Sequence, residues 1–258
     1  MPIKIGPAGI GPLKEVEKTF EEYMNLGIKS AEIPFTYGVY IRKTEDALKV
    51  KTASEKFGIS LSVHAPYWIN LNSEEKEKVE ASKKRILGSC KIADWLTAEK
   101  VVFHCGFFGK KSKEESYKNI RDRIIEMKIE IIKKKWKVKL APETMGKVNI
   151  FGSAEEISKL IRDTNCSFCL DFAHILARDK KIEWKKIEKL FPQKNWHCHF
   201  SGIEYNEKGE KRHTRTKPKY WKYILENLPK DKKITIINES PSPMKDCIEG
   251  LKIINVSL

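Results

Sequence analysis

Short apolar runs recur along the chain, and each ends at a histidine or an acidic residue that is soon followed by Gly, Pro, Ala or Ser. Apolar runs of this length, bounded by turn-forming residues, are typical of buried strands. The six runs end at His64, His104, Glu143, Asp171, His199 and Glu239. Since strands of one parallel sheet end at a common edge, we expect these six side chains to point to one place.

The spacing of these six residues indicates what kind of sheet it is. Successive members are 40, 39, 28, 28 and 40 residues apart. A parallel strand, a crossover helix and two loops need about 30 residues, so each step corresponds to one β/α unit. Two earlier strand candidates, Ile3–Ile5 and Ser30–Ile33, extend the series to eight units. We therefore predict an α/β fold, a single (β/α)8 TIM barrel with its site at the C-terminal strand ends.

Helical segments fill the gaps between these strands. Apolar residues recur at helical spacing over Pro12–Leu26 and Thr44–Phe57, and Gly27 and Gly58 follow as expected helix ends. Three later helices carry candidate N-terminal capping pairs. These pairs are Asn72 with Glu75, Ser112 with Glu115, and Ser153 with Glu156. The segment Ser201–Lys219 shows no such pattern, and we expect a long loop there.

Length and composition fit one domain that covers residues 1–258. The sequence has no 18-residue apolar run and no signal-peptide pattern, so we expect a cytoplasmic protein without a membrane partner. Six cysteines fit reduced thiols in that compartment. Cys166 and Cys169 have CxxC spacing, but in a strand they would face opposite sides, which disfavours a shared metal or redox role.

The net charge of +15 admits two interpretations. Such a charge attracts polyanions, including nucleic acids, over long range. A Lys-rich and Glu-rich composition with a single glutamine, Gln193, is also typical of proteins from hot-living organisms. Charge alone leaves both interpretations open.

Histidines are concentrated at the predicted strand ends. His64, His104, His174 and His199 lie at or just after a strand, and His213 lies in the loop beyond. A lone histidine in such a place is more often structural than a ligand. Here Glu143, Asp171 and Glu239 share the same rim, which reverses that preference. His197 precedes His199 by two residues on the same strand face, where we expect support or packing rather than ligation.

Mixed imidazole and carboxylate ligands suit Zn2+, Mn2+ or Fe2+ better than Mg2+ or Ca2+. The number of candidate ligands exceeds the need of one four-coordinate ion, so we predict at least two metals. Glu143 is central in chain order and is the candidate bridging ligand. Two bridged ions can activate a water molecule for attack on a phosphodiester, which predicts a metal-dependent hydrolase.

These residues, taken in order, resemble the endonuclease IV family, and among its members the compact archaeal type. The resemblance rests on His64-Ala-Pro-Tyr67, His104, Glu143, Leu170-Asp171-Phe-Ala-His174, His199 and Asn238-Glu239. It implies a TIM barrel with a trinuclear zinc centre. It also implies DNA repair at abasic sites in double-stranded DNA, by incision 5′ to the lesion through a metal-bound hydroxide. The products are a 3′-hydroxyl and a 5′-deoxyribose phosphate.

The resemblance assigns ligands by position, with Mn2+ as an alternative to Zn2+. It places His64, His104 and Glu143 on a first zinc, Glu143, Asp171, His199 and Glu239 on a second, and His174 and His213 on a third. One position departs from the family pattern, because Lys211 stands where an Asp ligand of the third ion is usual. A lysine cation cannot bind zinc, and the neighbouring Glu210 is the candidate replacement.

The resemblance also assigns residues that contact DNA. Tyr67 and Trp68 stand where the family inserts a loop at the lesion, which agrees with apolar wedges elsewhere. Tyr40 stands where family members insert an arginine, and Arg42 lies nearby. We expect the protein to act as a monomer.

Two other functions remain open. A sugar isomerase or epimerase of the related xylose isomerase-like barrels would also place Glu, Asp and His around a divalent metal. Such enzymes need fewer imidazoles and no aromatic wedge. A DNA-binding protein that kept the barrel without the chemistry is the third possibility, and Lys211 is its support. The metal content distinguishes the three.

Overall fold

The computed structural model of the chain describes residues 3–257 and contains the predicted eight parallel strands within them. The eight are β1 (Ile3–Pro7), β2 (Ser30–Pro34), β3 (Ser60–His64), β4 (Lys100–Phe103), β5 (Lys139–Pro142), β6 (Leu170–Asp171), β7 (Asn195–Phe200) and β10 (Lys233–Asn238). Neighbouring strands pair in parallel, so the eight strands run in the same direction around the barrel. A crossover connection joins each strand to the next one along the chain.

The strands close into a ring through two four-stranded sheets. One sheet has the order β1-β10-β7-β6 and the other β2-β3-β4-β5. Parallel bridges join them on both sides, from Ala8 to Glu32 and from Glu143 to Cys169. The backbone N–H of Gly9 donates to the carbonyl of Glu32 at 2.8 Å, which extends the pairing of β1 with β2. The predicted TIM barrel is confirmed.

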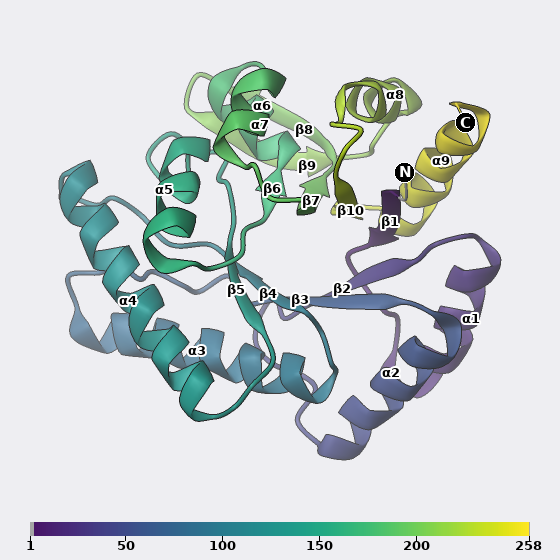
Figure 1. Cartoon of the computed structure of the whole chain (residues 1–258), viewed down its shortest axis with the longest axis horizontal. Helices are drawn as coiled ribbons and strands as arrows, with labels where there is room; N and C mark the ends of the chain where they lie inside the picture. Colours follow the sequence, from purple (N-terminus) through teal and green to yellow (C-terminus); the bar gives the residue numbers. More distant parts are fainter. Residues whose placement is uncertain (1–2, 258) are drawn as a thin grey trace.

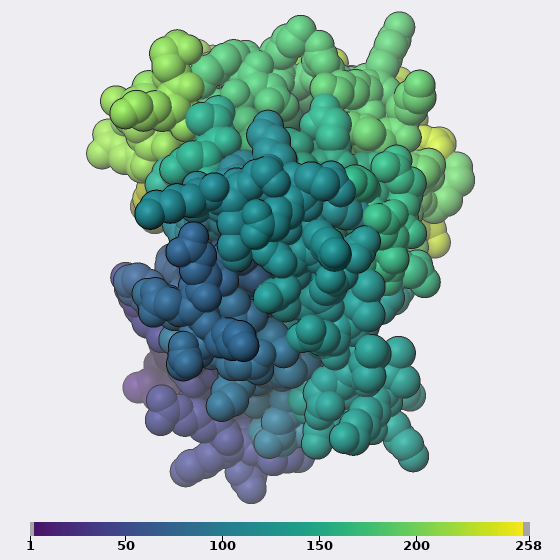
Figure 2. All heavy atoms as spheres, turned by 90° about the vertical axis from the view of Figure 1, so that its left-hand side faces the viewer, coloured from purple at the N-terminus to yellow at the C-terminus, as the bar shows by residue number. Residues whose placement is uncertain are grey.

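Helices surround this ring of strands (Figure 1). They are α1 (Val16–Asn25, after a 3-10 turn at Leu13–Glu15), α2 (Thr44–Phe57), α3 (Lys76–Trp95), α4 (Lys113–Lys133), α5 (Ala154–Thr164), α6 (Phe172–Asp179), α7 (Trp184–Leu190), α8 (Pro218–Asn227) and α9 (Pro243–Ser257). In Figure 2 the colours succeed one another from purple and blue at the bottom to green at the top, as the units follow one another around the barrel. Among residues 3–257, no helix has the length and apolar character needed to cross a membrane.

Two of the three predicted capping pairs stabilise helix starts. Ser153 and Glu156 form a complete capping box at α5, and Ser112 accepts from the Glu115 backbone at α4. The third prediction was wrong, because the side chain of Asn72 does not cap α3. Its amide instead donates to the carbonyls of Phe107 and Phe108, which ties the loop after β3 to the loop after β4.

The expected long loop Ser201–Lys219 contains an antiparallel hairpin. Its strands are β8 (Gly202–Asn206) and β9 (Gly209–Thr214). Most side chains of both strands are exposed or half-buried, so the sequence lacks the apolar alternation that reveals a strand. The pairing is irregular: Glu204 lies opposite Arg212, but Tyr205 lies opposite Glu210. Lys211 is therefore the extra residue of a β-bulge.

Candidate metal centre

The predicted strand-end residues converge at one mouth of the barrel, with Glu143 in their middle. Its side chain is fully buried, and its Oε2 lies 3.1 Å from Nε2 of His64 and 3.1 Å from Nε2 of His104. Its Oε1 lies 3.3 Å from Nδ1 of His174 and 3.3 Å from Nδ1 of His199. We call these five residues the Glu143 cluster.

Two further carboxylates, those of Glu239 and Asp171, lie beside histidines of the cluster. Oε1 of Glu239, which follows β10, lies 3.4 Å from Nδ1 of His199. Asp171 ends β6 and is the N-cap of α6, where its Oδ1 accepts from the backbone N–H of His174 at 2.7 Å. The Asp-x-x-His spacing is thus a helix start, which turns both side chains to the same side. The other oxygen of Asp171 lies 3.5 Å from Nδ1 of His174.

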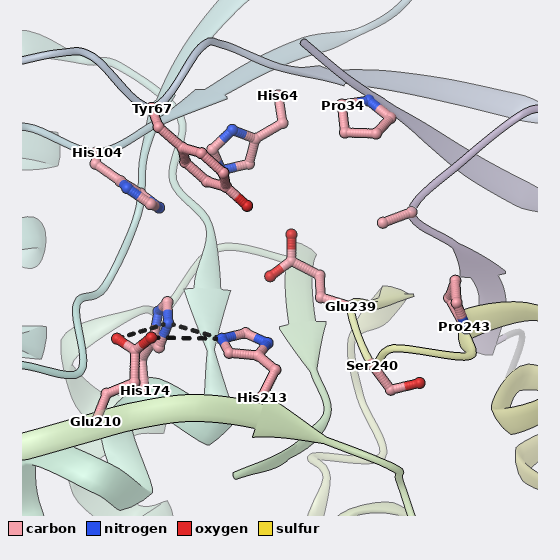
Figure 3. A pocket seen from close by; sticks show the side chains of 11 residues that line it. Pro34, His64, Tyr67, His104, His174, Glu210, His213, Glu239, Ser240 and Pro243 are labelled. Atoms are coloured by element: carbon pink, nitrogen blue, oxygen red, sulfur yellow. Dashed lines mark hydrogen bonds and ion pairs between the residues drawn. The ribbon is translucent and has the colours of Figure 1, made fainter. Parts of the chain in front are cut away.

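A second group of ligand-type atoms lies beside α6. Nε2 of His174 lies 3.2 Å from Nε2 of His213 and 3.4 Å from Oε2 of Glu210 (Figure 3). Nδ1 of His174 lies 2.9 Å from the Thr144 carbonyl, which leaves Nε2 to face this group. Two imidazole nitrogens and a carboxylate that approach one another so closely are suited to sharing a cation.

The β-bulge explains why Glu210 occupies this place. In a regular strand, residue 211 would share the face of His213, because side chains alternate. The extra residue shifts that alternation, so Glu210 falls on the His213 face while Lys211 is exposed to solvent. The backbone N–H of Glu210 also donates to the carbonyl of Gly146 at 3.2 Å, which fixes the hairpin against the loop after β5.

Several buried polar atoms in this region make no regular hydrogen bond. Among the described residues these include Oε1 of Glu143, Oδ2 of Asp171 and both ring nitrogens of His199. Buried polar groups without partners are costly, and native proteins rarely tolerate them. These atoms are carboxylate oxygens and imidazole nitrogens, which are the kinds that bind zinc, so the donor set fits divalent cations. Among the described residues, five sets have ligand atoms within 4.8 Å of one another. Three match the predicted ligands: His64, His104 and Glu143; Glu143, Asp171, His199 and Glu239; and Asp171, His174 and His213. The other two are His64, His199 and Glu239, and Cys169, His197 and His199.

Electrostatics couple the histidines and carboxylates tightly. Burial alone would lower the pKa of His64, but the Glu143 carboxylate raises it to about 9. Burial would raise the pKa of Glu143, but His199 and His104 hold it well below its usual range. Burial, with the nearby Glu143 charge, raises the pKa of Asp171. The pKa values of His174 and His199 are likewise raised well above their usual range by the neighbouring carboxylates, with Asp171 and Glu239 among them. In the metal-free protein His64, His174 and His199 therefore bind protons at the place where the donor set fits cations.

The sequence pattern that defines the xylose isomerase-like TIM barrel family matches residues 20–254. The chain belongs to this family. The protein MJ0133 of Methanocaldococcus jannaschii, which is named as uncharacterised, is 35% identical over 97% of this chain and 96% of its own length. A protein of Thermoplasma volcanium named "Probable endonuclease 4" is 31% identical over 56% of this chain and 50% of its own length.

Several solved structures share the fold of this xylose isomerase-like barrel. SacUVDE superposes with a TM-score of 0.75 at 14% identity, covering 99% of each chain. Endonuclease IV from Thermus thermophilus superposes with a TM-score of 0.72 at 19% identity, covering 98% of each chain. D-Psicose 3-epimerase from Clostridium cellulolyticum reaches 0.69 at 12% identity, covering 98% of this chain and 99% of its own. At these identities the superpositions establish the fold alone.

The residues predicted to contact DNA take different positions in this barrel. Tyr67 lines the pocket above the cluster, with its ring stacked on His104 at 6.0 Å between centroids. Trp68 follows it and is 66% exposed. Tyr40 packs edge-on against Phe35 and is half-exposed, outside the residues that line the pocket. Arg42 is exposed and donates to the carbonyl of Val39 at 3.4 Å.

One buried acid beneath the cluster was not predicted from the sequence. Glu32, in β2, is fully buried and lies 3.1 Å from Nε2 of His197 and 2.9 Å from Nε2 of His199. Burial would raise its pKa, but His199 and His197 lower it well below the usual range. A single acidic residue within a buried strand was the available signal, because such residues are almost never buried without a partner.

Proposed function

We propose that this chain is a zinc-dependent endonuclease of DNA base excision repair that hydrolyses the phosphodiester 5′ to an abasic site. The products would be a 3′-hydroxyl and a 5′-deoxyribose phosphate. The observation that carries the proposal is the Glu143 cluster, in which four histidines approach one buried carboxylate. Similarity to endonuclease 4 proteins over half of the chain supports a nuclease at the level of the family.

The ligand sets suggest which residues would hold each ion. Glu143 would bridge one ion, shared with His64 and His104, and a second, shared with Asp171, His199 and Glu239. Bound zinc would stabilise the charge that develops on the phosphate oxygens and lower the pKa of an attacking water. The chain's own part is to fix these side chains rigidly at the strand ends, so that the reacting groups need little reorganisation.

Charge balance favours a third ion. Five carboxylates surround the site, namely Glu32, Glu143, Asp171, Glu210 and Glu239. With neutral histidines, two divalent ions would leave one net negative charge, and three would leave one net positive charge. A site that receives an anionic phosphodiester is better served by the second state, because like charges repel strongly in a buried site. We therefore assign His174, His213 and Glu210 to the third ion.

The third ion gives a testable prediction at Gly146. A methyl group on Gly146 would lie 2.7 Å from Cβ of Glu210, which is closer than real atoms approach, and 3.1 Å from Cδ2 of His174, which is a tight contact. We expect Gly146→Ala to displace Glu210, so that about one zinc per chain is lost while the other two stay bound. Metal analysis after gel filtration measures this. Gly88→Ala is the matched control, since a methyl group there meets no atom within 4 Å. Full zinc content in Gly146→Ala would contradict the assignment of Glu210.

In this proposal, the pocket above the cluster receives the nucleotide that lacks a base. It has a volume of about 500 Å3 and is lined in part by Ala8. Tyr67 lies on one side of it, and Pro34 and Pro243 lie on the other (Figure 3). The exposed Trp68 beside it would enter the base stack and occupy the gap at the lesion. The net charge of +15 would add affinity for the DNA backbone that does not depend on sequence.

Incision of a defined duplex tests the proposal directly. We expect the zinc-loaded protein to cut a duplex that contains one tetrahydrofuran abasic analogue, on the 5′ side, and to leave a 3′-hydroxyl that a polymerase extends. Chelation should abolish the cut and added zinc should restore it. The same duplex with an intact base is the control. Absence of 5′ incision by the metal-loaded protein would refute the proposal.

A sugar epimerase is the second candidate, because epimerases are among the solved structures with the same fold. The number of imidazoles disfavours it, since five histidines surround the pocket and the cluster beneath it. The metal content separates the two functions: two or three zinc ions per chain support the nuclease, and one Mn2+ or Mg2+ supports the epimerase.

A further inference from the structure

Glu32 is a charged side chain in the interior of the barrel, and no Lys or Arg within residues 3–257 forms an ion pair with it. It is fully buried below the Glu143 cluster. A buried carboxylate costs several kcal/mol unless other groups compensate for its lost hydration. Its neighbours are two histidines of β7 and the hydroxyl of Ser62, which donates to Oε2 at 2.7 Å. Such a costly group at the base of a candidate site calls for a role.

The two oxygens of Glu32 have different surroundings. Oε2 is held in place by Ser62 and by Nε2 of His197 at 3.1 Å, in a regular hydrogen bond. Oε1 makes no regular hydrogen bond, although Nε2 of His199 lies only 2.9 Å away. The carboxylate is thus anchored by one oxygen and presents the other to His199. The distance of 2.9 Å lies within the range of a hydrogen bond.

His199 has carboxylates on both sides of its ring. Nε2 faces Glu32 below, and Nδ1 faces Glu143 at 3.3 Å and Glu239 at 3.4 Å above. A neutral imidazole carries one proton, so one nitrogen donates and the other offers a lone pair. A carboxylate that accepts the proton from one nitrogen fixes the tautomer and raises the basicity of the other.

We infer that Glu32 is the positioning residue of His199: it accepts the Nε2 proton, so that Nδ1 offers its lone pair to the cation held by Glu143 and Glu239. His197 and Ser62 have the supporting role of fixing Glu32. The inference rests on the proposed metal centre and adds to it a residue that touches neither cation nor substrate. It also gives a reason for the buried charge of Glu32, because this negative charge would help to neutralise the positive charge of the ions.

The tautomer of His199 is directly measurable in the intact protein. Long-range 1H–15N spectra of the zinc-loaded wild-type chain, labelled at its six histidines, distinguish the two neutral tautomers. We expect His199 to carry its proton on Nε2. The resonance is assigned by its loss in His199→Gln. A proton on Nδ1 in the zinc-loaded protein would overturn the inference, and this measurement needs no change at Glu32.

Zinc affinity provides the second readout. We expect Glu32→Gln to bind zinc about 10- to 100-fold more weakly in competition with a chromogenic chelator, the usual effect of losing a carboxylate behind a histidine ligand. Glu32→Asp keeps the charge at a shorter reach and should fall between Glu32→Gln and the wild type. Glu99→Gln is the matched control, because Glu99 pairs with Lys100 at 2.9 Å and does not contact His199.

The outcomes separate this inference from the proposed function. If Glu32→Gln lowers the melting temperature but leaves zinc affinity and the His199 tautomer unchanged, Glu32 has only a structural role and the inference fails. If the wild-type chain binds zinc as expected but does not cut abasic DNA, the proposed function fails while the Glu32 result stands. Both readouts are taken without DNA, so neither depends on the reaction.

Discussion

Replacing Glu143 by Gln is expected to abolish DNA incision and to release zinc. The substitution keeps the shape of the side chain but removes its charge and one of two oxygens that approach four histidines. Loss of a group one step removed from a metal typically costs 10- to 100-fold, so loss of the proposed bridging ligand should cost about 1,000-fold or more. Incision of the abasic-analogue duplex and metal analysis of the purified variant measure both effects.

Two further variants make the Glu143 result interpretable. Glu143→Asp retains the charge and should keep part of the bound zinc, which separates loss of ligation from loss of folding. Glu204→Gln is the control for the chemical change, since Glu204 pairs with Arg212 on the outer hairpin. A Glu143→Gln protein that keeps most of its activity and its metal would show that Glu143 is not a shared ligand.

The barrel and the meeting place of the strand-end residues could be predicted because both follow from periodicity. In a parallel sheet the C-terminal strand ends share one edge, so residues such as His64 and Glu143, 79 positions apart in the chain, meet at 3.1 Å. A metal site could then be predicted from the residue types alone, without knowledge of how their side chains pack. A spacing rule locates an edge of the sheet, and the edge locates the site.

Glu32 and the bulge that places Glu210 show where this reasoning ends, although Glu210 itself was the candidate replacement for Lys211. In β2 every residue from Ser30 to Ile33 is buried, so there is no alternation to tell which side chains face the barrel interior. Glu210 replaces Lys211 near His213 because of a single bulge in a hairpin whose strands are polar on both sides. Neither a shift in strand register nor the strand face that a residue occupies could be predicted here from the amino-acid sequence. Both were decided by contacts between segments distant in the sequence.

The pH dependence of stability is expected to reverse its sign when zinc binds. In the metal-free protein the pKa of His64 is raised from 6.5 to about 9, and Asp171 and Glu143 contribute to raising the pKa of His174 well above its usual range. Groups whose pKa is raised on folding bind protons more tightly in the folded state, which stabilises it most below pH 6.5. This stabilisation is lost as the pH rises to 9, and His64 alone accounts for about 3 kcal/mol.

Zinc-loaded protein should show the opposite slope over the same window. Zinc binds neutral imidazole, so binding releases protons and becomes stronger as the pH rises from 6.5 to 9. Urea unfolding at the two pH values, with the metal-free protein and with protein freed of excess zinc, measures both slopes. The variant His64→Gln should flatten the metal-free slope, because it removes the group whose pKa rises to about 9. Parallel slopes with and without zinc would mean that these histidines do not exchange protons for a metal, and the candidate centre would then be an ordinary buried network of ion pairs.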